Sequence, residues 1–113
     1  DDLLQRTKSQ LDSYFDGALQ AFALPLQPAG TDFQRRVWAL MERISYGDTM
    51  TYGEMAKALN SAARAVGMAC GANPIPLIIP CHRVLAANGM GGYSGDGGVE
   101  TKVQLLRLEK VLL

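Results

Sequence analysis

The sequence predicts a small, mainly helical domain that contains a helix-turn-helix in a winged-helix-like arrangement, with little β structure. Three observations predict this class. Capping boxes that begin at Thr31 and Thr51 mark the starts of two helices. Apolar residues after each box recur at helical spacing. The polar pair Asn60-Ser61 then separates the second of these helices from another, which gives helix-turn-helix proportions.

The chain is predicted to begin with a helix and a connector that precede the main domain. Residues 3–16 carry apolar side chains at helical spacing, namely Leu4, Leu11 and Phe15, and Gly17 follows where a helix C-cap belongs. Residues 18–30 contain two prolines and a glycine, which is typical of an extended connector. The main domain then covers residues 31–113.

Each helix of the main domain has its own boundary signals. An apolar stripe follows Thr31 and consists of Phe33, Val37, Leu40, Met41 and Ile44. Tyr46-Gly47 is expected to end that helix. The helix after Thr51 has Tyr52, Met55 and Leu59 on one face.

Proline and glycine punctuate the second half of the chain. Ser61 is the expected N-cap of a helix over about 62–72, which must stop before Asn73-Pro74-Ile75-Pro76 because proline cannot donate a backbone hydrogen bond. Residues 88–98 are predicted to be a glycine-rich loop, and a last helix is predicted over about 100–112.

Composition limits the class of protein. The chain has 113 residues, of which 48% are apolar, so a single globular core is available. Eleven basic and eleven acidic side chains balance, so composition does not indicate nucleic acid, although a footprint of a few phosphates needs no excess charge. The two cysteines are too few for a disulfide framework, and no signal peptide or membrane-spanning run is present. We therefore expect a soluble, intracellular protein.

The helix predicted over 62–72 has one face of unusual composition. Arg64, Gly67, Met68 and Gly71 share that face by helical spacing, while Val66, Ala69 and Cys70 form the opposite one. Such a face can approach the backbone or minor groove of a nucleic acid closely, with Arg64 as the probing side chain. Alternatively, the glycines allow tight packing inside a helical hairpin.

The run Pro80-Cys81-His82-Arg83-Val84 places a cysteine beside the only histidine of the chain. A nearby imidazole can take the proton of a thiol and so raise the fraction of reactive thiolate. The alternative is a buried structural cysteine next to a surface histidine.

Glu109 is predicted to point inward from the last helix. It shares a face with Lys102, Leu105, Leu106 and Leu113, and a buried carboxylate needs a partner. His82 is the candidate, because a Glu–His pair fixes the tautomer of the imidazole and lets it act as a base toward Cys81. The alternative is that Glu109 lies at the rim of the helix and faces water.

Two other kinds of site are not supported. Cys70, Cys81 and His82 lack the paired short spacings of structural zinc sites, so no metal is expected. The glycines between 89 and 98 lack the Lys-Ser/Thr ending of a phosphate loop. They are more typical of a flexible wall around a ligand.

These motifs together resemble the O6-alkylguanine-DNA alkyltransferases. The resemblance runs in order from about Tyr14 to the C-terminus, and Pro80-Cys81-His82-Arg83-Val84 after Asn73-Pro74 is its most specific signature. Further matches are Tyr52-Gly53-Glu54, Ala63-Arg64-Ala65-Val66-Gly67, Gly92-Tyr93-Ser94-Gly95 and Leu105-Leu106-Arg107-Leu108-Glu109.

The resemblance implies a DNA repair protein that moves an alkyl group from O6-alkylguanine in duplex DNA to Cys81, once and irreversibly. It implies that His82 deprotonates Cys81 through a water and that Glu109 orients His82. Tyr52 helps to rotate the nucleotide out of the helix and donates a proton toward the purine. Lys102 supports charge near the site.

The resemblance also implies the DNA-binding and pocket residues. Arg64 enters the duplex from the minor groove in place of the extruded nucleotide. Tyr52 and Gly67 lie at the same interface, and Asn73 is the hinge between the DNA-binding helix and the active-site turn. The base pocket is lined by Pro76, Tyr93 and Ser94, with the backbone carbonyls of Cys81 and Val84 toward the exocyclic amine. Neither a cofactor nor a membrane is implied, and the chain is expected to act as a monomer.

Some features depart from the pattern of the family. Residues 1–30 correspond to a helix and linker remaining from an N-terminal domain, and residues 31–113 to the DNA-binding and active-site domain. Gly71 stands where the animal proteins place a basic residue, the turn before Ala63 is shorter, and the loop after Tyr93 is longer. Two other functions stay open: a module that binds alkylated DNA without transfer, and a cysteine hydrolase that uses Cys81, His82 and Glu109.

Overall fold

Helices dominate the part of the chain that the computed structural model describes, which is residues 2–25, 28–93, 95 and 97–112. The α-helices are α1 (Asp2–Phe15), α2 (Asp32–Glu42), α3 (Tyr52–Ala58), α4 (Ala63–Gly71) and α5 (Gly98–Leu108), and a short 3-10 helix covers Cys81–Arg83. Strands β1 (Met50–Thr51) and β2 (Val84–Leu85) pair in parallel, Met50 opposite Val84. The predicted mainly helical class with little β structure is confirmed.

Both predicted capping boxes are present. The Thr31 hydroxyl accepts from the Gln34 backbone and the Gln34 side chain accepts from the Thr31 backbone, and Thr51 and Glu54 repeat this arrangement. Each box satisfies amide groups that the first turn of a helix leaves without an intrahelical partner. The starts of α2 and α3 are therefore encoded within four residues each.

The turn between α3 and α4 is longer than the predicted two residues, and Ser61 is not the N-cap of α4. Asn60 adopts the left-handed conformation (φ 53°), and the Ser61 amide donates to the Ala56 carbonyl at 2.8 Å. This six-to-one bond closes a Schellman motif, so Ser61 ends α3 through its backbone. Ala62 is the N-cap instead and makes no side-chain cap.

A second Schellman motif ends α5 earlier than predicted, at Leu108. Lys110 is left-handed (φ 64°), and the Val111 amide donates to the Leu106 carbonyl at 2.9 Å. Glu109 therefore takes the C-cap position and does not lie within the helix. Lys102, Leu105 and Leu106 of the predicted inward face are all buried, and Leu113, its last member, lies outside the described residues.

The core lies between α2, α3, α4 and the segment that carries Cys81. Val37, Met41 and Ile44 of the predicted stripe are buried, and Trp38, which is outside that stripe, is buried with them. Its indole Nε1 donates to the Ala69 carbonyl at 2.8 Å, which ties α2 to α4. The Trp38 hydrogen bond helps to set the position of α4 relative to the rest of the core.

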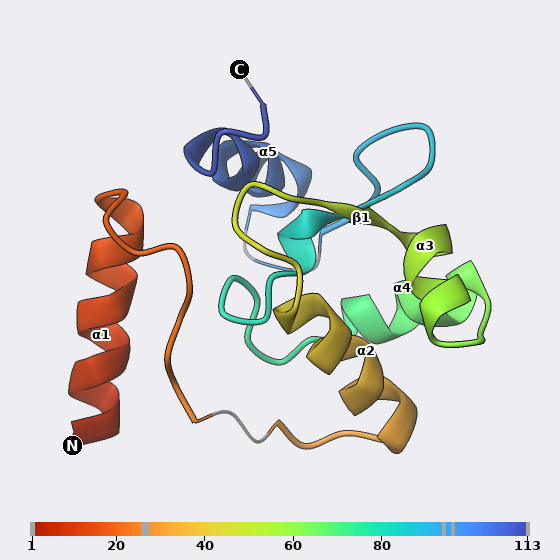
Figure 1. Ribbon diagram of the computed structural model, residues 1–113, viewed down its shortest axis with the longest axis horizontal. Coiled ribbons are helices and arrows are strands. Elements are labelled where there is room, and N and C mark those ends of the chain that lie inside the picture. The colour runs from red at the N-terminus through yellow and green to blue at the C-terminus, as the bar shows by residue number, and fades with distance from the viewer. Residues whose placement is uncertain (1, 26–27, 94, 96, 113) are drawn as a thin grey trace.

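Helix α1 stands apart from the other helices and is joined to α2 by a long connector (Figure 1). Its predicted apolar stripe does not face the core, because the side chains of Leu4 and Phe15 are 68% and 55% exposed. The buried residue of α1 is Tyr14. Among the described residues, no helix combines the length and the apolar character that crossing a bilayer requires.

Candidate active site

Cys81 is held on a constrained turn between α4 and β2. Its amide donates to the Ile79 carbonyl at 2.8 Å, and the Arg83 amide donates to the Pro80 carbonyl at 3.0 Å. Asn73 links this turn to the end of α4, because its Nδ2 donates to the Ile79 carbonyl and its Oδ1 accepts from the Ile75 amide. Asn73 thus connects the two segments, and its role as a hinge between them stays a prediction.

Cys81 lines a cavity of about 360 Å³. The cavity lies between the start of α3, the small-residue side of α4 and the loop after β2, and its other lining residues are Tyr52, Gly67, Cys70, Gly71, Gly92 and Tyr93. A cavity of this size is within the range of small-ligand sites. Tyr52 and Tyr93, which the resemblance placed at the reacting base, thus lie around the same cavity as Cys81, and Gly67, which was expected only at the DNA interface, lines it as well.

Other predicted pocket residues lie elsewhere. Pro76 lines a neighbouring, more apolar cavity of about 500 Å³, which shares Tyr93 with the first. Val84 is fully buried, and its carbonyl accepts a hydrogen bond from Lys102 at 2.6 Å. Ser94 is outside the described residues. The sequence did not single out Cys70 as a wall of the Cys81 cavity, although it had placed Cys70 on the inner face of α4.

His82 and Glu109 form the predicted buried pair. His82 Nε2 lies 2.7 Å from Glu109 Oε2, and both side chains are fully buried. An ionised carboxylate can only accept hydrogen bonds, so Nε2 must carry the ring proton and Nδ1 of neutral His82 is left as a base. Nδ1 is buried and has no hydrogen-bond partner among the described residues.

The burial of His82 favours its neutral form. Burial lowers the pKa of His82, and the hydrogen bond and charge of Glu109 oppose that effect without overcoming it. A neutral imidazole with a bare Nδ1 is the form that can accept a proton from a thiol. The protonation state and the tautomer therefore both suit His82 as a base.

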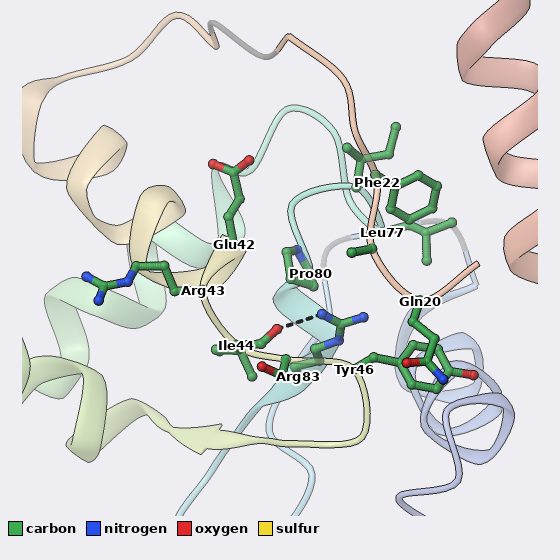
Figure 2. A pocket seen from close by; sticks show the side chains of 12 residues that line it. Gln20, Phe22, Glu42, Arg43, Ile44, Tyr46, Leu77, Pro80 and Arg83 are labelled. Carbon is green, nitrogen blue, oxygen red and sulfur yellow. Dashed lines mark hydrogen bonds between the residues drawn. The ribbon is translucent and has the colours of Figure 1, made fainter.

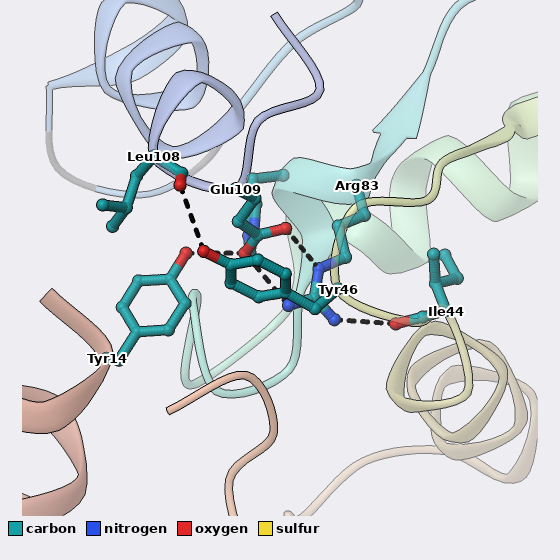
Figure 3. A network of polar contacts seen from close by, with 7 residues as sticks. Tyr14, Ile44, Tyr46, Arg83, Leu108 and Glu109 are labelled. Atoms are coloured by element: carbon teal, nitrogen blue, oxygen red, sulfur yellow. Dashed lines mark hydrogen bonds and ion pairs between the residues drawn. The ribbon is translucent and has the colours of Figure 1, made fainter. Parts of the chain in front are cut away.

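The pair extends to two residues that the sequence analysis did not assign to the site, Arg83 and Tyr14. Arg83 binds both carboxylate oxygens of Glu109, through Nε at 2.8 Å and Nη2 at 3.0 Å. The Tyr14 hydroxyl donates to Oε2 at 2.6 Å. Figure 3 shows Tyr14 and Arg83 approaching Glu109 from different sides. No local pattern identifies either contact, although Arg83 follows directly after the Cys-His pair.

The surroundings of Glu109 keep it ionised. Burial by itself raises the pKa of Glu109, but the hydrogen bonds from His82, Arg83 and Tyr14 outweigh that effect and lower the pKa to about 2. Together these donors make four hydrogen bonds to the two carboxylate oxygens. Three of the four go to Oε2 and one to Oε1, so Oε2 is the more heavily shared oxygen.

Arg83 also connects the site to the end of α2. Its Nη1 donates to the Ile44 carbonyl at 2.7 Å, as Figure 2 shows. Arg83 also borders a hollow of about 320 Å³, whose lining includes residues 20–22 of the connector and Leu77, Ile78 and Pro80 of the turn. The fixed guanidinium in turn fixes the plane of the Glu109 carboxylate.

Lys102 stabilises the wall of the Cys81 cavity. Its ammonium donates to the carbonyls of Val84, Met90 and Gly92 at 2.6, 2.6 and 2.9 Å, which uses all three of its donors. It also lies 6.0 Å from the centre of the Tyr52 ring. Lys102 is therefore a buried positive charge that holds the loop residue Gly92, which lines the cavity together with Tyr52.

The outer face of α4 distinguishes between the two interpretations of its glycines. An added Cβ at Gly67 or at Gly71 meets no heavy atom within 4 Å, so neither glycine is required for internal packing. Arg64 and Met68 on the same face are exposed, whereas Val66, Ala69 and Cys70 are buried. The tight-hairpin interpretation is thus wrong for these glycines, and the face is open for an external partner.

Fold and site together define a helix-turn-helix domain in which a buried cysteine is adjacent to a histidine held by a carboxylate. Within the described residues, no three His, Cys, Asp or Glu side chains gather closely enough to hold a metal ion. The family model for the DNA binding domain of 6-O-methylguanine DNA methyltransferase matches residues 32–111. The chain belongs to this family.

Relatives and solved structures agree with this assignment. The chain is 51% identical over 105 residues to the methylated-DNA–protein-cysteine methyltransferase of Mycobacterium leprae, covering 90% of this chain and 62% of the relative. It is 46% identical over 112 residues to that of Methanosarcina acetivorans, covering 96% of this chain and 70% of the relative. The structure of Mycobacterium tuberculosis OGT in complex with DNA superposes with a TM-score of 0.87 at 48% identity, over 92% of this chain and 64% of that one. The chain therefore spans roughly two thirds of the length of these relatives.

Proposed function

We propose that this chain repairs DNA directly, by transferring an alkyl group from O6-alkylguanine in duplex DNA to Cys81. One observation carries the proposal: Cys81 lines an open cavity next to a histidine whose Nε2 is committed to Glu109, so that Nδ1 is available as a base. A cysteine of this kind is activated by removal of its proton. The related methyltransferases are named for the transfer of a methyl group to cysteine.

The proposed chemistry is a single displacement. The thiol proton of Cys81 passes to His82 Nδ1, directly or through water, and the thiolate attacks the alkyl carbon. The new S–C bond forms as the bond between that carbon and guanine O6 breaks. Guanine takes up one proton, for which Tyr52 at the cavity wall is the proposed donor. His82 then releases the proton of Cys81 to water and Tyr52 regains one from water, so the protons balance. The product is a thioether, so each molecule acts once.

The proposed DNA interface is the outer face of α4. A thiolate cannot reach a base that is stacked in a duplex, so the nucleotide must first be extruded. The open positions at Gly67 and Gly71 allow a close approach of the minor groove, and the exposed Arg64 can fill the space that the nucleotide leaves. Tyr93 would receive the base, and the family resemblance adds Ser94, Pro76 from the neighbouring cavity that shares Tyr93, and the backbone carbonyls of Cys81 and Val84, the second of which also accepts from Lys102. Residues 31–113 would carry both activities as a monomer, with residues 1–30 as the preceding helix and linker.

Intact-mass measurement with an O6-methylguanine duplex tests this function. We expect each molecule to gain one methyl group on the Cys81 peptide and then to stop reacting. Cys81→Ala should still bind the duplex but should gain no mass, and Cys70→Ser should still gain its single methyl group on the Cys81 peptide. Binding by the parent without mass gain would instead identify a lesion-binding module, and sustained turnover would identify a hydrolase.

A further inference from the structure

Tyr14 is the point at which α1 meets the active site. In α1 it is the residue whose side chain is fully buried, although the helix stands apart from the helical body (Figure 1). Its ring packs against Phe22 of the connector and edge-on against Tyr46, with ring centres 5.4 and 6.2 Å away. These contacts aim its hydroxyl at Glu109 (Figure 3).

The Tyr14 hydroxyl shares one oxygen with the proposed base. Glu109 Oε2 accepts from Tyr14 at 2.6 Å, lies 2.7 Å from His82 Nε2 and accepts from Arg83 at 3.0 Å. Burial raises the pKa of Tyr14, and the hydrogen bond to Glu109 raises it further, so Tyr14 stays a donor at any pH near neutrality. Three donors thus compete for the charge of a single oxygen in a buried site.

We propose that Tyr14 is a positioning residue for the transfer reaction: it holds Glu109 Oε2 and withdraws part of its charge, and α1 thereby controls the proton acceptor of Cys81. The proposal rests on the transfer function proposed above. It makes α1 a part of the reaction machinery, in contrast to the expectation that residues 1–30 are only a remnant of another domain.

Several ionisable groups face His82 and Glu109 and bear on any titration measured there. They come from four places in the fold: Tyr14 of α1, Arg83 of the 3-10 helix and Lys102 of α5 act on His82 or Glu109, and Tyr46 of the segment before β1 acts on Tyr14. Among them, Tyr46 offers a matched control. Its ring touches Tyr14 and lies 5.8 Å from the Arg83 guanidinium, but its hydroxyl donates to the Leu108 carbonyl at 3.1 Å and not to Glu109.

The test compares Tyr14→Phe with Tyr46→Phe in the full chain. His82 is the only histidine, so its NMR titration is unambiguous. Without the Tyr14 hydroxyl, more of the Oε2 charge is available to an imidazolium, so the midpoint of the His82 titration should rise by roughly half a pH unit. Tyr46→Phe should leave it unchanged. In the pH profile of the Cys81 reaction with free O6-benzylguanine, the acid limb should move upward with the His82 midpoint in Tyr14→Phe alone.

A midpoint that is the same in Tyr14→Phe and the parent, or that moves equally in both variants, would overturn the proposal. If Tyr14→Phe does not fold, the parent protein with 13C-labelled tyrosine decides the question. The chemical shift of the Tyr14 ring should change with pH at the same midpoint as that of His82. A Tyr14 shift that stays constant through the His82 titration would count against the proposal. Because neither titration requires alkyl transfer, a parent that takes no methyl group contradicts the proposed function and leaves this coupling separately testable.

Discussion

At the scale of single residues, Glu109 is bonded to more than the predicted partner His82. It holds the imidazole through Oε2 and the Arg83 guanidinium through both oxygens, and Arg83 in turn holds the Ile44 carbonyl. The two interpretations left open by the sequence are resolved, because the Glu109 side chain is fully buried and does not face water. One carboxylate therefore connects the proposed base His82 to the packing around the site.

Glu109→Gln should damage reactivity and stability together. The uncharged amide cannot balance the buried Arg83 guanidinium, and loss of one partner of a buried ion pair costs about 3–5 kcal/mol. The reaction of Cys81 with O6-benzylguanine at neutral pH should slow by about tenfold or more, because the base is no longer supported. Urea unfolding measures the stability. Mass spectrometry of samples quenched at successive times measures the rate of the Cys81 reaction. Glu100→Gln, at an exposed position in the first turn of α5, is the control and should change neither quantity.

At the scale of the elements, α4 has an inner face that is packed against the core and an outer face that is not. Its inner face packs into the core and receives the Trp38 hydrogen bond, so it is under packing constraint. Its outer face has glycines at positions where a side chain meets nothing within the protein. Glycine in the interior of a helix weakens that helix, so these positions are not explained by the stability of the fold.

Gly67→Ala should therefore stabilise the fold and slow the proposed reaction with duplex DNA. Because the new Cβ meets no heavy atom within 4 Å, the helix should gain about 0.5–1 kcal/mol. Transfer from an O6-methylguanine duplex should slow, since a side chain now stands between α4 and the DNA. Thermal unfolding and duplex titration measure the two effects. A variant that is more stable and reacts with duplex at the parent rate would show that this face does not approach DNA.

At the scale of the whole molecule, one buried polar cluster joins the beginning, the middle and the end of the chain. Tyr14, Arg83 and Glu109 come from α1, the 3-10 helix and the end of α5, and they are in direct contact. The state of this cluster should therefore appear in global unfolding. His82, which is bonded to Glu109, and Glu109 itself both titrate in acid, and protonation of either lowers the stability of the folded state.

The stability of the protein should fall as the solution becomes acidic, in two stages. The pKa of His82 is lowered by burial, so the folded state resists its protonation and stability begins to fall below about pH 6.5. The pKa of Glu109 is about 2 against an ordinary 4.5, so its contribution of about 3 kcal/mol is complete above 4.5 and is lost as pH falls toward 2. Urea midpoints between pH 7 and pH 3 measure this dependence. A midpoint that does not change over that range would contradict the buried cluster.

Much of this protein is determined by signals that act within a few residues. The capping boxes at Thr31 and Thr51 start α2 and α3 as predicted, because each is closed by hydrogen bonds between residues three apart. The two faces of α4 follow from helical periodicity, which is also local. The ends of α3 and α5 were less predictable, because Asn60 and Lys110 take a left-handed conformation that glycine would have signalled more clearly.

Only the tertiary structure decided which groups complete the site. The inward position of Glu109 and its pairing with His82 were inferred because burial of a carboxylate demands a partner, but nothing local identifies all of its partners. Tyr14 is 95 residues from Glu109 in sequence, and its contact depends on where the folded connector places α1. The three carbonyls that bind Lys102 likewise meet at one point only after the loop beyond β2 has closed over α5. Local hydrogen bonds can be inferred from sequence spacing, whereas contacts across the fold are set by the packing of the whole chain.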